Sequence, residues 1–139
     1  NQKMGVTIII VTHQMEVVEQ ICDRMALLQA GKIILKGEVK QLFLENSEPL
    51  RELLGRKLTF EPGVFIRILI ENKSNYRKFF YELSSEMKIA YEICDGGIRN
   101  FKDGSAFLGT LKIETKDSDE FMRYLKKKKV LFEVQENGA

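Results

Sequence analysis

The chain has 139 residues, of which 44% are hydrophobic and 30% charged, and 22 basic against 20 acidic residues give a net charge of +2. This composition is typical of a globular protein with one average domain or two small ones, and the near-neutral charge gives no indication of nucleic-acid binding. No apolar run approaches the roughly 20 residues that span a bilayer, and no signal peptide is visible.

The first predicted unit is a strand, a histidine and a helix. Thr7–Val11 is a continuous β-branched run, which is typical of a strand covered on both faces in a parallel α/β sheet. Thr12 is the expected N-cap of a helix, because apolar side chains then recur at helical spacing. His13, the one histidine of the sequence, is therefore expected at the carboxyl end of a strand, where open α/β sheets bind ligands. The alternative is an incidental imidazole at a capped helix start.

The next predicted elements are a hairpin and two helices. They cover residues 25–29, 32–35, 38–44 and 47–54. Gly31 is expected at a hairpin position that needs positive φ, and Gly37 at the end of the second strand. Pro49 suits the first turn of the last helix, which Gly55 is expected to end. An extended link then predicts a domain boundary near residue 60.

From residue 63 the pattern changes to strict apolar alternation, which is typical of half-buried strands. The predicted strands cover 63–71, 89–101, 106–115 and 130–135, and the helices cover 74–87 and 118–128. This βαββαβ order is that of the α+β ferredoxin-like fold. One sheet face is expected to pack against both helices. The other carries Phe65, Leu69, Leu108 and Leu131, and is expected to invite a partner sheet. Gly96-Gly97 indicates a bulge, or a close approach by another backbone or a ligand.

The segment V-T-H-x-M-E-V-V followed by I-C-D-R, residues 11–24, resembles the switch-histidine segment of ABC-transporter ATPases. The resemblance is closest to the amino-acid importers, and among them to the methionine importer. Further matching residues follow in the family's order: Asp23-Arg24, Gly31-Lys32-Ile33, Gly37-Glu38-Val39 and Phe43. The resemblance implies that residues 1–60 are the α/β tail of a P-loop ABC ATPase domain. In that family His13 would contact the γ-phosphate of ATP, and an imidazole can donate the hydrogen bond.

Several motifs of such ATPases are missing from the sequence. There is no G-x-x-x-x-G-K-[ST], no signature sequence and no Asp-Glu pair before His13. We therefore expect ATP and Mg²⁺ to belong to the intact protein and this chain alone to bind neither, so that its status as an enzyme stays uncertain. Because it starts at Asn1 in mid-pattern, we expect a fragment. Cys22 and Cys94 are predicted to be buried, reduced thiols in a cytosolic protein, and no metal site is predicted.

Residues 61–139 resemble the NIL domain at the C-terminus of methionine-importer ATPases, which is similar in shape to ACT-type amino-acid sensors. Three short stretches carry this resemblance: Gly97-Ile98, Leu108–Leu111 and Val130–Val134. In the family an Asn-Ile-Leu step helps bind methionine at the interface between two such domains, and glycine replaces the asparagine here. The resemblance implies a pocket formed by residues 95–99 and 107–110. The implied ligand-binding residues are Gly97, Ile98, Leu108 and Gly109.

The implied protein is the ATP-binding subunit of an importer on the inner face of the cell membrane. Its implied partners are a second copy bound through the C-terminal domain, membrane permease subunits and L-methionine, which would inhibit transport; no nucleic acid is implied. Two alternatives stay open. In the first, the C-terminal domain dimerises without binding a ligand, and the glycine at position 97 favours this alternative. In the second, the cargo is another amino acid or a related sulfur compound.

Overall fold

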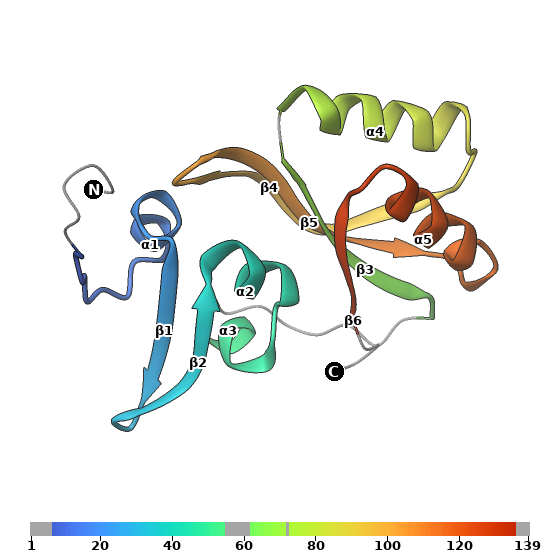
Figure 1. The fold of residues 1–139 in the computed structure, drawn as a ribbon. Coiled ribbons are helices and arrows are strands. Elements are labelled where there is room, and N and C mark those ends of the chain that lie inside the picture. Colours follow the sequence, from blue (N-terminus) through green and yellow to red (C-terminus); the bar gives the residue numbers. More distant parts are fainter. Residues whose placement is uncertain (1–6, 55–61, 72, 136–139) are drawn as a thin grey trace.

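The computed structural model describes residues 7–54, 62–71 and 73–135 (Figure 1). Its elements are, in chain order, α1 (Met15–Ile21), β1 (Arg24–Gln29), β2 (Lys32–Glu38), α2 (Val39–Glu45), α3 (Glu48–Leu53), β3 (Val64–Glu71), α4 (Lys73–Ser85), β4 (Tyr91–Phe101), β5 (Gly104–Ile113), the short 3₁₀ helix η2 (Thr115–Asp117), α5 (Ser118–Lys127) and β6 (Leu131–Gln135). Within these ranges no helix is long and apolar enough to cross a membrane.

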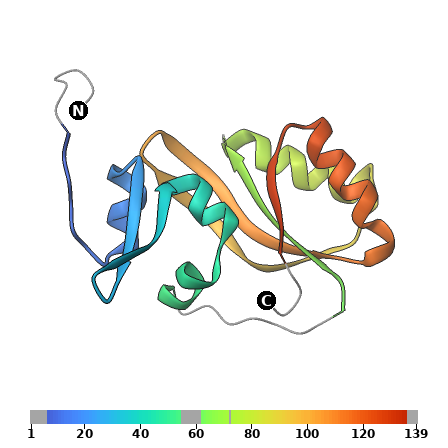
Figure 2. The same ribbon diagram turned by 60° about the horizontal axis from the view of Figure 1, so that its bottom comes forward.

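The C-terminal part is a four-stranded antiparallel sheet in the order β4-β5-β3-β6. Helices α4 and α5 lie against one face of it (Figures 1 and 2). The predicted βαββαβ order is confirmed, and the arrangement is compatible with a ferredoxin-like fold. The core on this face comes from alternate strand residues and from one side of each helix. It includes Ile66, Ile68, Ile70, Phe79, Leu83, Phe107, Leu111, Ile113, Phe121 and Leu125.

The opposite face of the same sheet is covered by the N-terminal helices. A second buried cluster joins α1, α2 and α3 to β3, β4 and β5: Val18, Val39, Phe43, Leu44, Leu50, Leu69, Phe101, Ala106 and Leu108. The expectation that this face is open to a partner sheet is therefore wrong. Leu69 and Leu108 are each only 2% exposed. The face has its own helices, and they come from the first 54 residues of the chain.

Residues 7–11 do not form the predicted strand. They belong to neither described sheet, and Ile9 and Val11 are 86% and 94% exposed. A parallel strand needs hydrogen-bonding neighbours at its edges and helices on its faces, and the described residues supply neither here. Thr12 is not the N-cap of α1, which begins after Gln14. Its hydroxyl instead accepts the Gln14 N–H at 3.0 Å.

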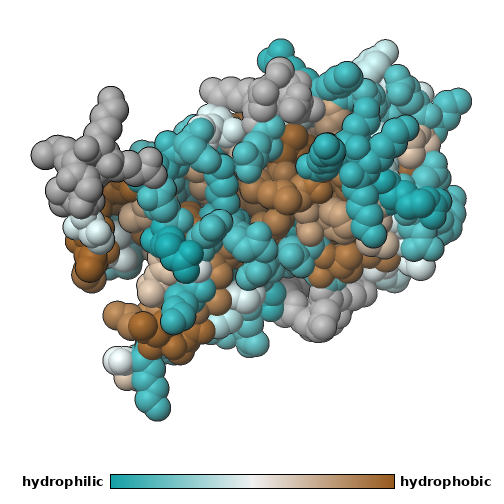
Figure 3. Space-filling model, viewed as in Figure 1, coloured by the Kyte–Doolittle hydropathy of each residue, from teal (hydrophilic) through white to brown (hydrophobic). Residues whose placement is uncertain are grey.

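The predicted hairpin of β1 and β2 is confirmed. Its turn has Ala30 and Gly31 at φ +50° and +77°, as a two-residue turn with two left-handed positions requires. β2 continues through Gly37 to Glu38 rather than ending at the glycine. Figure 3 shows hydrophobic surface over this hairpin and near residues 7–11. The predicted helix end at Gly55 and the domain boundary near residue 60 lie outside the described residues.

Candidate functional site

The pairing of β4 with β5 brings the four predicted ligand-binding residues together. Gly97 lies directly opposite Leu108, and the next pair joins Ile98 to Phe107. On the other side, Gly96 lies opposite Gly109. All four candidates therefore occupy three consecutive pairs in the middle of one hairpin.

Their side chains do not point into one pocket. Successive strand residues face opposite sides of a sheet, so Leu108 and Ile98 are on different faces. Leu108 is 2% exposed beneath the N-terminal helices, whereas Ile98 is 41% exposed at the sheet edge. Of the four predicted ligand-binding residues, Gly97 and Ile98 are accessible to a small ligand within one chain, whereas Leu108 and Gly109 are buried.

Gly96 and Gly109 allow a close approach of two backbones. A Cβ atom on Gly109 would lie 2.7 Å from the carbonyl oxygen of Asp95, and one on Gly96 would lie 2.8 Å from the Cα atom of Gly109. A Cβ on Gly97 would meet nothing within 4 Å. The predicted close approach is thus to another strand of the same chain. The bulge lies at Cys94, where the β4–β5 register shifts between Ile93 and Asp95. The prediction that both cysteines are buried is wrong, because Cys94 is exposed at this edge strand and Cys22 is only partly buried.

A buried arginine in β3 connects this hairpin to α2. Arg67 in β3 is 1% exposed. Its Nε donates to the carbonyl oxygen of Phe43 at 2.7 Å, and its Nη1 donates to Asp95 Oδ1 and Thr110 Oγ1, each at 3.1 Å. A guanidinium keeps its charge at all ordinary pH values, so burial requires such partners. Sequence reasoning missed this network, although a single arginine within the apolar run of β3 was a signal.

A second arginine joins β4 to α1. Arg99 donates from Nε to Glu19 Oε2 at 3.2 Å and also pairs with Glu19 through Nη2. Glu19 is only 4% exposed, so its carboxylate depends on this partner. The ion pair attaches the helix that follows His13 to the strand that carries Gly97 and Ile98.

Two further ion pairs lie at the tip of the β4–β5 hairpin, which reaches α1 (Figure 2). Lys102 lies 2.8 Å from Asp23, and Lys40 lies 2.6 Å from Asp103. The hydrogen bond from Lys40 lowers the pKa of Asp103. The carboxylates of the two pairs are 62% and 68% exposed, and pairs with an exposed partner contribute little to stability. They nevertheless extend the contact between the N-terminal part of the chain and the sheet as far as the tip of the β4–β5 hairpin.

His13 lies in the exposed segment just before α1. No described strand precedes it, so the expected position at the carboxyl end of a strand is not observed. Among the described residues no group of three or more His, Cys, Asp or Glu side chains could hold a metal ion.

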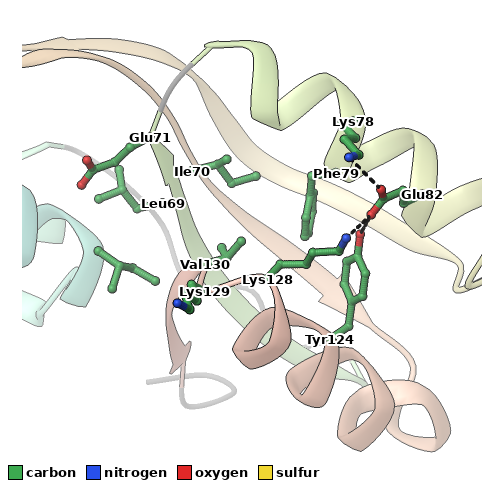
Figure 4. A pocket seen from close by; sticks show the side chains of 11 residues that line it. Leu69, Ile70, Glu71, Lys78, Phe79, Glu82, Tyr124, Lys128, Lys129 and Val130 are labelled. Carbon is green, nitrogen blue, oxygen red and sulfur yellow. Dashed lines mark hydrogen bonds and ion pairs between the residues drawn. The ribbon is translucent and has the colours of Figure 1, made fainter.

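A cavity of about 540 Å³ lies on the other face, between α4, α5 and the ends of β3 and β6 (Figure 4). Its apolar lining consists of Leu69, Ile70, Phe79, Val130 and Leu131. None of the predicted ligand-binding residues lines it. Its size is within the range of small-molecule sites.

Part of the polar wall of this cavity is a network around Glu82. Tyr124 donates its hydroxyl proton to Glu82 Oε2 at 2.5 Å, and Lys128 Nζ lies 3.1 Å from the same oxygen. These contacts lower the pKa of Glu82, with the Tyr124 hydrogen bond as the largest cause. Burial, and then the Glu82 carboxylate, raises the pKa of Tyr124. The two buried members of this network, Glu82 and Tyr124, therefore satisfy one another.

The chain is similar over nearly its whole length to ATP-binding subunits of importers. More particularly, it is a homologue of the methionine import ATP-binding proteins MetN, which confirms the resemblance inferred from its motifs. It is 35% identical over 140 residues to that of Clostridioides difficile, which covers 99% of this chain and 43% of the relative. It is 32% identical over 137 residues to the relative from Clostridium acetobutylicum, and this alignment covers 96% of this chain and 43% of the relative. It is 31% identical over 137 residues to the relative from Wolinella succinogenes, and this alignment covers 96% of this chain and 45% of the relative.

The chain therefore spans less than half the length of these curated relatives. No protein-family model matches it.

Proposed function

We propose that this chain is the C-terminal part of the ATP-binding subunit of an ABC importer for methionine. Residues 1–60 would complete the ABC ATPase domain, and residues 61–139 would form a NIL-type, ACT-like regulatory domain. The observation that carries this proposal is the match to methionine import ATP-binding proteins over 96–99% of the chain, because one alignment runs through both parts. The intact protein would work on the cytoplasmic face of the membrane beside its permease subunits.

The exposed segment before α1 supports the assignment of the first part. Ile8, Ile9 and Val11 are 65%, 86% and 94% exposed. A continuous β-branched apolar run is unusual on a surface, since large exposed apolar patches mark interaction sites. The run would be accounted for as a strand that pairs within the larger sheet of the intact ATPase domain. His13 would then follow that strand, as the resemblance implies.

The residues present do not hold a nucleotide by themselves. The sequence contains no glycine-rich loop with a lysine to surround the phosphates, and His13 lies exposed with no such loop beside it. ATP and Mg²⁺ would accordingly bind to the intact protein, and hydrolysis is not expected of this chain.

For the second part we propose methionine sensing at Gly97 and Ile98, with residues 95–99 and 107–110 around them. The support is geometric: Gly97 leaves open space beside the backbone, and Ile98 is partly exposed at the sheet edge. A thioether needs apolar contacts, while the amino and carboxylate groups need backbone partners. Methionine would inhibit transport only if it bound one arrangement of the paired subunits better than another.

A regulatory domain that pairs without binding ligand is the second candidate. Leu108, an implied ligand residue, is buried beneath α1 and α2 rather than exposed. Glycine at position 97 also removes the side chain that the family uses. Both observations favour pairing alone.

Calorimetry with the whole chain distinguishes these functions. L-methionine is titrated into the 139-residue protein, with L-leucine as the control and light scattering as the measure of oligomeric state. Saturable heat from methionine and none from leucine is expected for a methionine sensor. A dimer that gives no heat would contradict sensing and support pairing alone. Heat with a different amino acid would contradict methionine as the ligand.

A further inference from the structure

The cavity between α4 and α5 lies where β3 extends beyond β6. The pairing of β6 with β3 ends at Leu69 and Leu131, whereas β3 continues to Glu71. In the part of the chain that the structure describes, Ile70 and Glu71 therefore pair with β5 on one side only. Successive residues of a strand direct their backbone N–H and C=O groups to opposite sides. One of these two residues, both of which line the cavity, thus directs its backbone groups to the side where β6 has ended.

The floor of the cavity is apolar. Ile70 and Phe79 are 3% and 4% exposed, and Val130 packs against the same core. Figure 4 shows these three side chains between the end of β3 and the two helices. The volume of about 540 Å³ equals that of roughly 18 molecules of liquid water. This space is sufficient for an aliphatic chain, whose transfer from water to such a surface is favourable.

The rim of the cavity carries more positive than negative charge. Three lysine and two glutamate side chains line it: Lys78, Lys128, Lys129, Glu71 and Glu82. The difference is one positive charge. A rim of this kind favours an anionic ligand over a cationic one.

Both carboxylates of the rim already have cationic partners. Lys128 and Lys78 lie 3.1 and 3.8 Å from the Glu82 carboxylate. Lys40 of α2 lies 3.4 Å from the Glu71 carboxylate. A cationic ligand would have to compete with these lysines, whereas an anionic ligand would not displace them.

Lys129 is the rim cation that stays available to a ligand. Its side chain is exposed, and within the described ranges no ion pair engages its ammonium group. Its backbone is left-handed, with φ +58°, and its N–H donates to the carbonyl oxygen of Lys126 at 3.1 Å. The end of α5 therefore holds the turn that carries this ammonium group at the cavity.

We propose that this cavity binds an aliphatic monocarboxylate, a molecule with one unbranched apolar chain and one terminal carboxylate. The chain lies on Ile70, Phe79 and Val130, and the carboxylate faces the Lys129 ammonium group. Charge-assisted hydrogen bonds of this kind are stronger than those between neutral groups. The cavity contains none of the residues proposed for methionine sensing, so each proposal can fail without the other.

Calorimetry with the whole 139-residue chain tests the proposal. The probe is sodium octanoate, and the controls with the same chain length are 1-octanol and octylammonium chloride. Saturable binding of octanoate is expected with a Kd of about 1 mM or lower, since the probe has few atoms. The alcohol and the amine should bind at least about fivefold more weakly. No saturable binding of octanoate, or equal binding of all three probes, would overturn the proposal.

Two variants of the full chain locate the bound octanoate. Lys129→Gln should weaken octanoate binding at least about fivefold and leave octanol binding unchanged. Lys126→Gln is the matched control, because Lys126 is exposed on α5 and does not line the cavity. An equal loss in both variants would show a general attraction to the basic end of α5 and would refute the site.

Val130→Phe tests the cavity itself by filling it. This variant should weaken the binding of octanoate and of octanol at least about tenfold, with folding checked by circular dichroism. A folded variant that binds octanoate as the parent chain does would refute the apolar floor. If octanoate binding fails in the parent chain while L-methionine still gives saturable heat, the proposed function stands and only this cavity site is lost.

Discussion

Replacement of Arg67 by methionine is the most direct test of the contact between the N-terminal helices and the sheet. The guanidinium is 1% exposed and joins α2, through the carbonyl oxygen of Phe43, to Thr110 and Asp95. Methionine fills most of the space of the aliphatic stem, so the change removes the hydrogen bonds and the charge rather than the packing.

The magnitude follows from the three acceptors. The oxygens of Phe43 and Thr110 are buried, and leaving a buried acceptor without a donor costs about 1–3 kcal/mol. The Asp95 side chain is 40% exposed and regains water, so the loss of its contact costs less than about 1 kcal/mol. We expect a decrease of roughly 3 kcal/mol in the free energy of unfolding, which lowers the melting temperature by roughly 10 °C.

The assay is urea unfolding followed by circular dichroism, with thermal unfolding as a second measure. Arg123→Met is the matched control, because Arg123 is exposed on α5 and the same substitution there should cost less than about 0.5 kcal/mol. If Arg67→Met costs less than about 1 kcal/mol, the guanidinium is not enclosed between β3 and α2, and the covering of this sheet face is refuted.

Four further substitutions give distinct results in the same unfolding assay. Gly109→Ala should cost about 2 kcal/mol because the new Cβ meets a backbone oxygen at 2.7 Å, whereas Gly97→Ala, in open space, should cost less than about 0.5 kcal/mol; equal losses would contradict the close approach. The lowered pKa of Glu82 stabilises the fold above the unfolded pKa, and this stability is lost as pH falls through the lowered value. Tyr124→Phe should therefore make stability fall less steeply below about pH 4.5, and an unchanged slope would exclude this hydrogen bond. Val11→Asp should leave the stability of this chain within about 0.5 kcal/mol, because Val11 is 94% exposed; a larger loss would show that residues 7–11 are packed.

The C-terminal sheet could be predicted from the sequence because its signals are local. Alternation from Val64 to Ile70 defines a strand with two distinct faces, and helical spacing defines the apolar sides of α4 and α5. Gly96-Gly97 indicated a bulge or a close approach without identifying the partner. Each of these signals lies within a single element of secondary structure.

The contacts between the N-terminal helices and the sheet join residues that are far apart in the sequence. The hydrogen bonds of Arg67 join residues 24, 28 and 43 positions away, and no periodicity within β3 identifies them. The alternation showed that Leu69 faces away from the α4–α5 core, but not which helices cover it. For Thr7–Val11 the β-branched run gives a strand preference, yet a strand also requires neighbours, and preference alone does not supply them.

The second buried cluster has a consequence for exchanging parts between relatives. Leu69, Phe101 and Leu108 pack against Val18 and Phe43, and Arg99 neutralises Glu19, so the sheet and the helices before it have to match each other. A chimera that takes residues 61–139 from one relative and residues 15–54 from another would combine two halves of different cores. Such a chimera should fold well only when the facing residues of both halves come from the same parent.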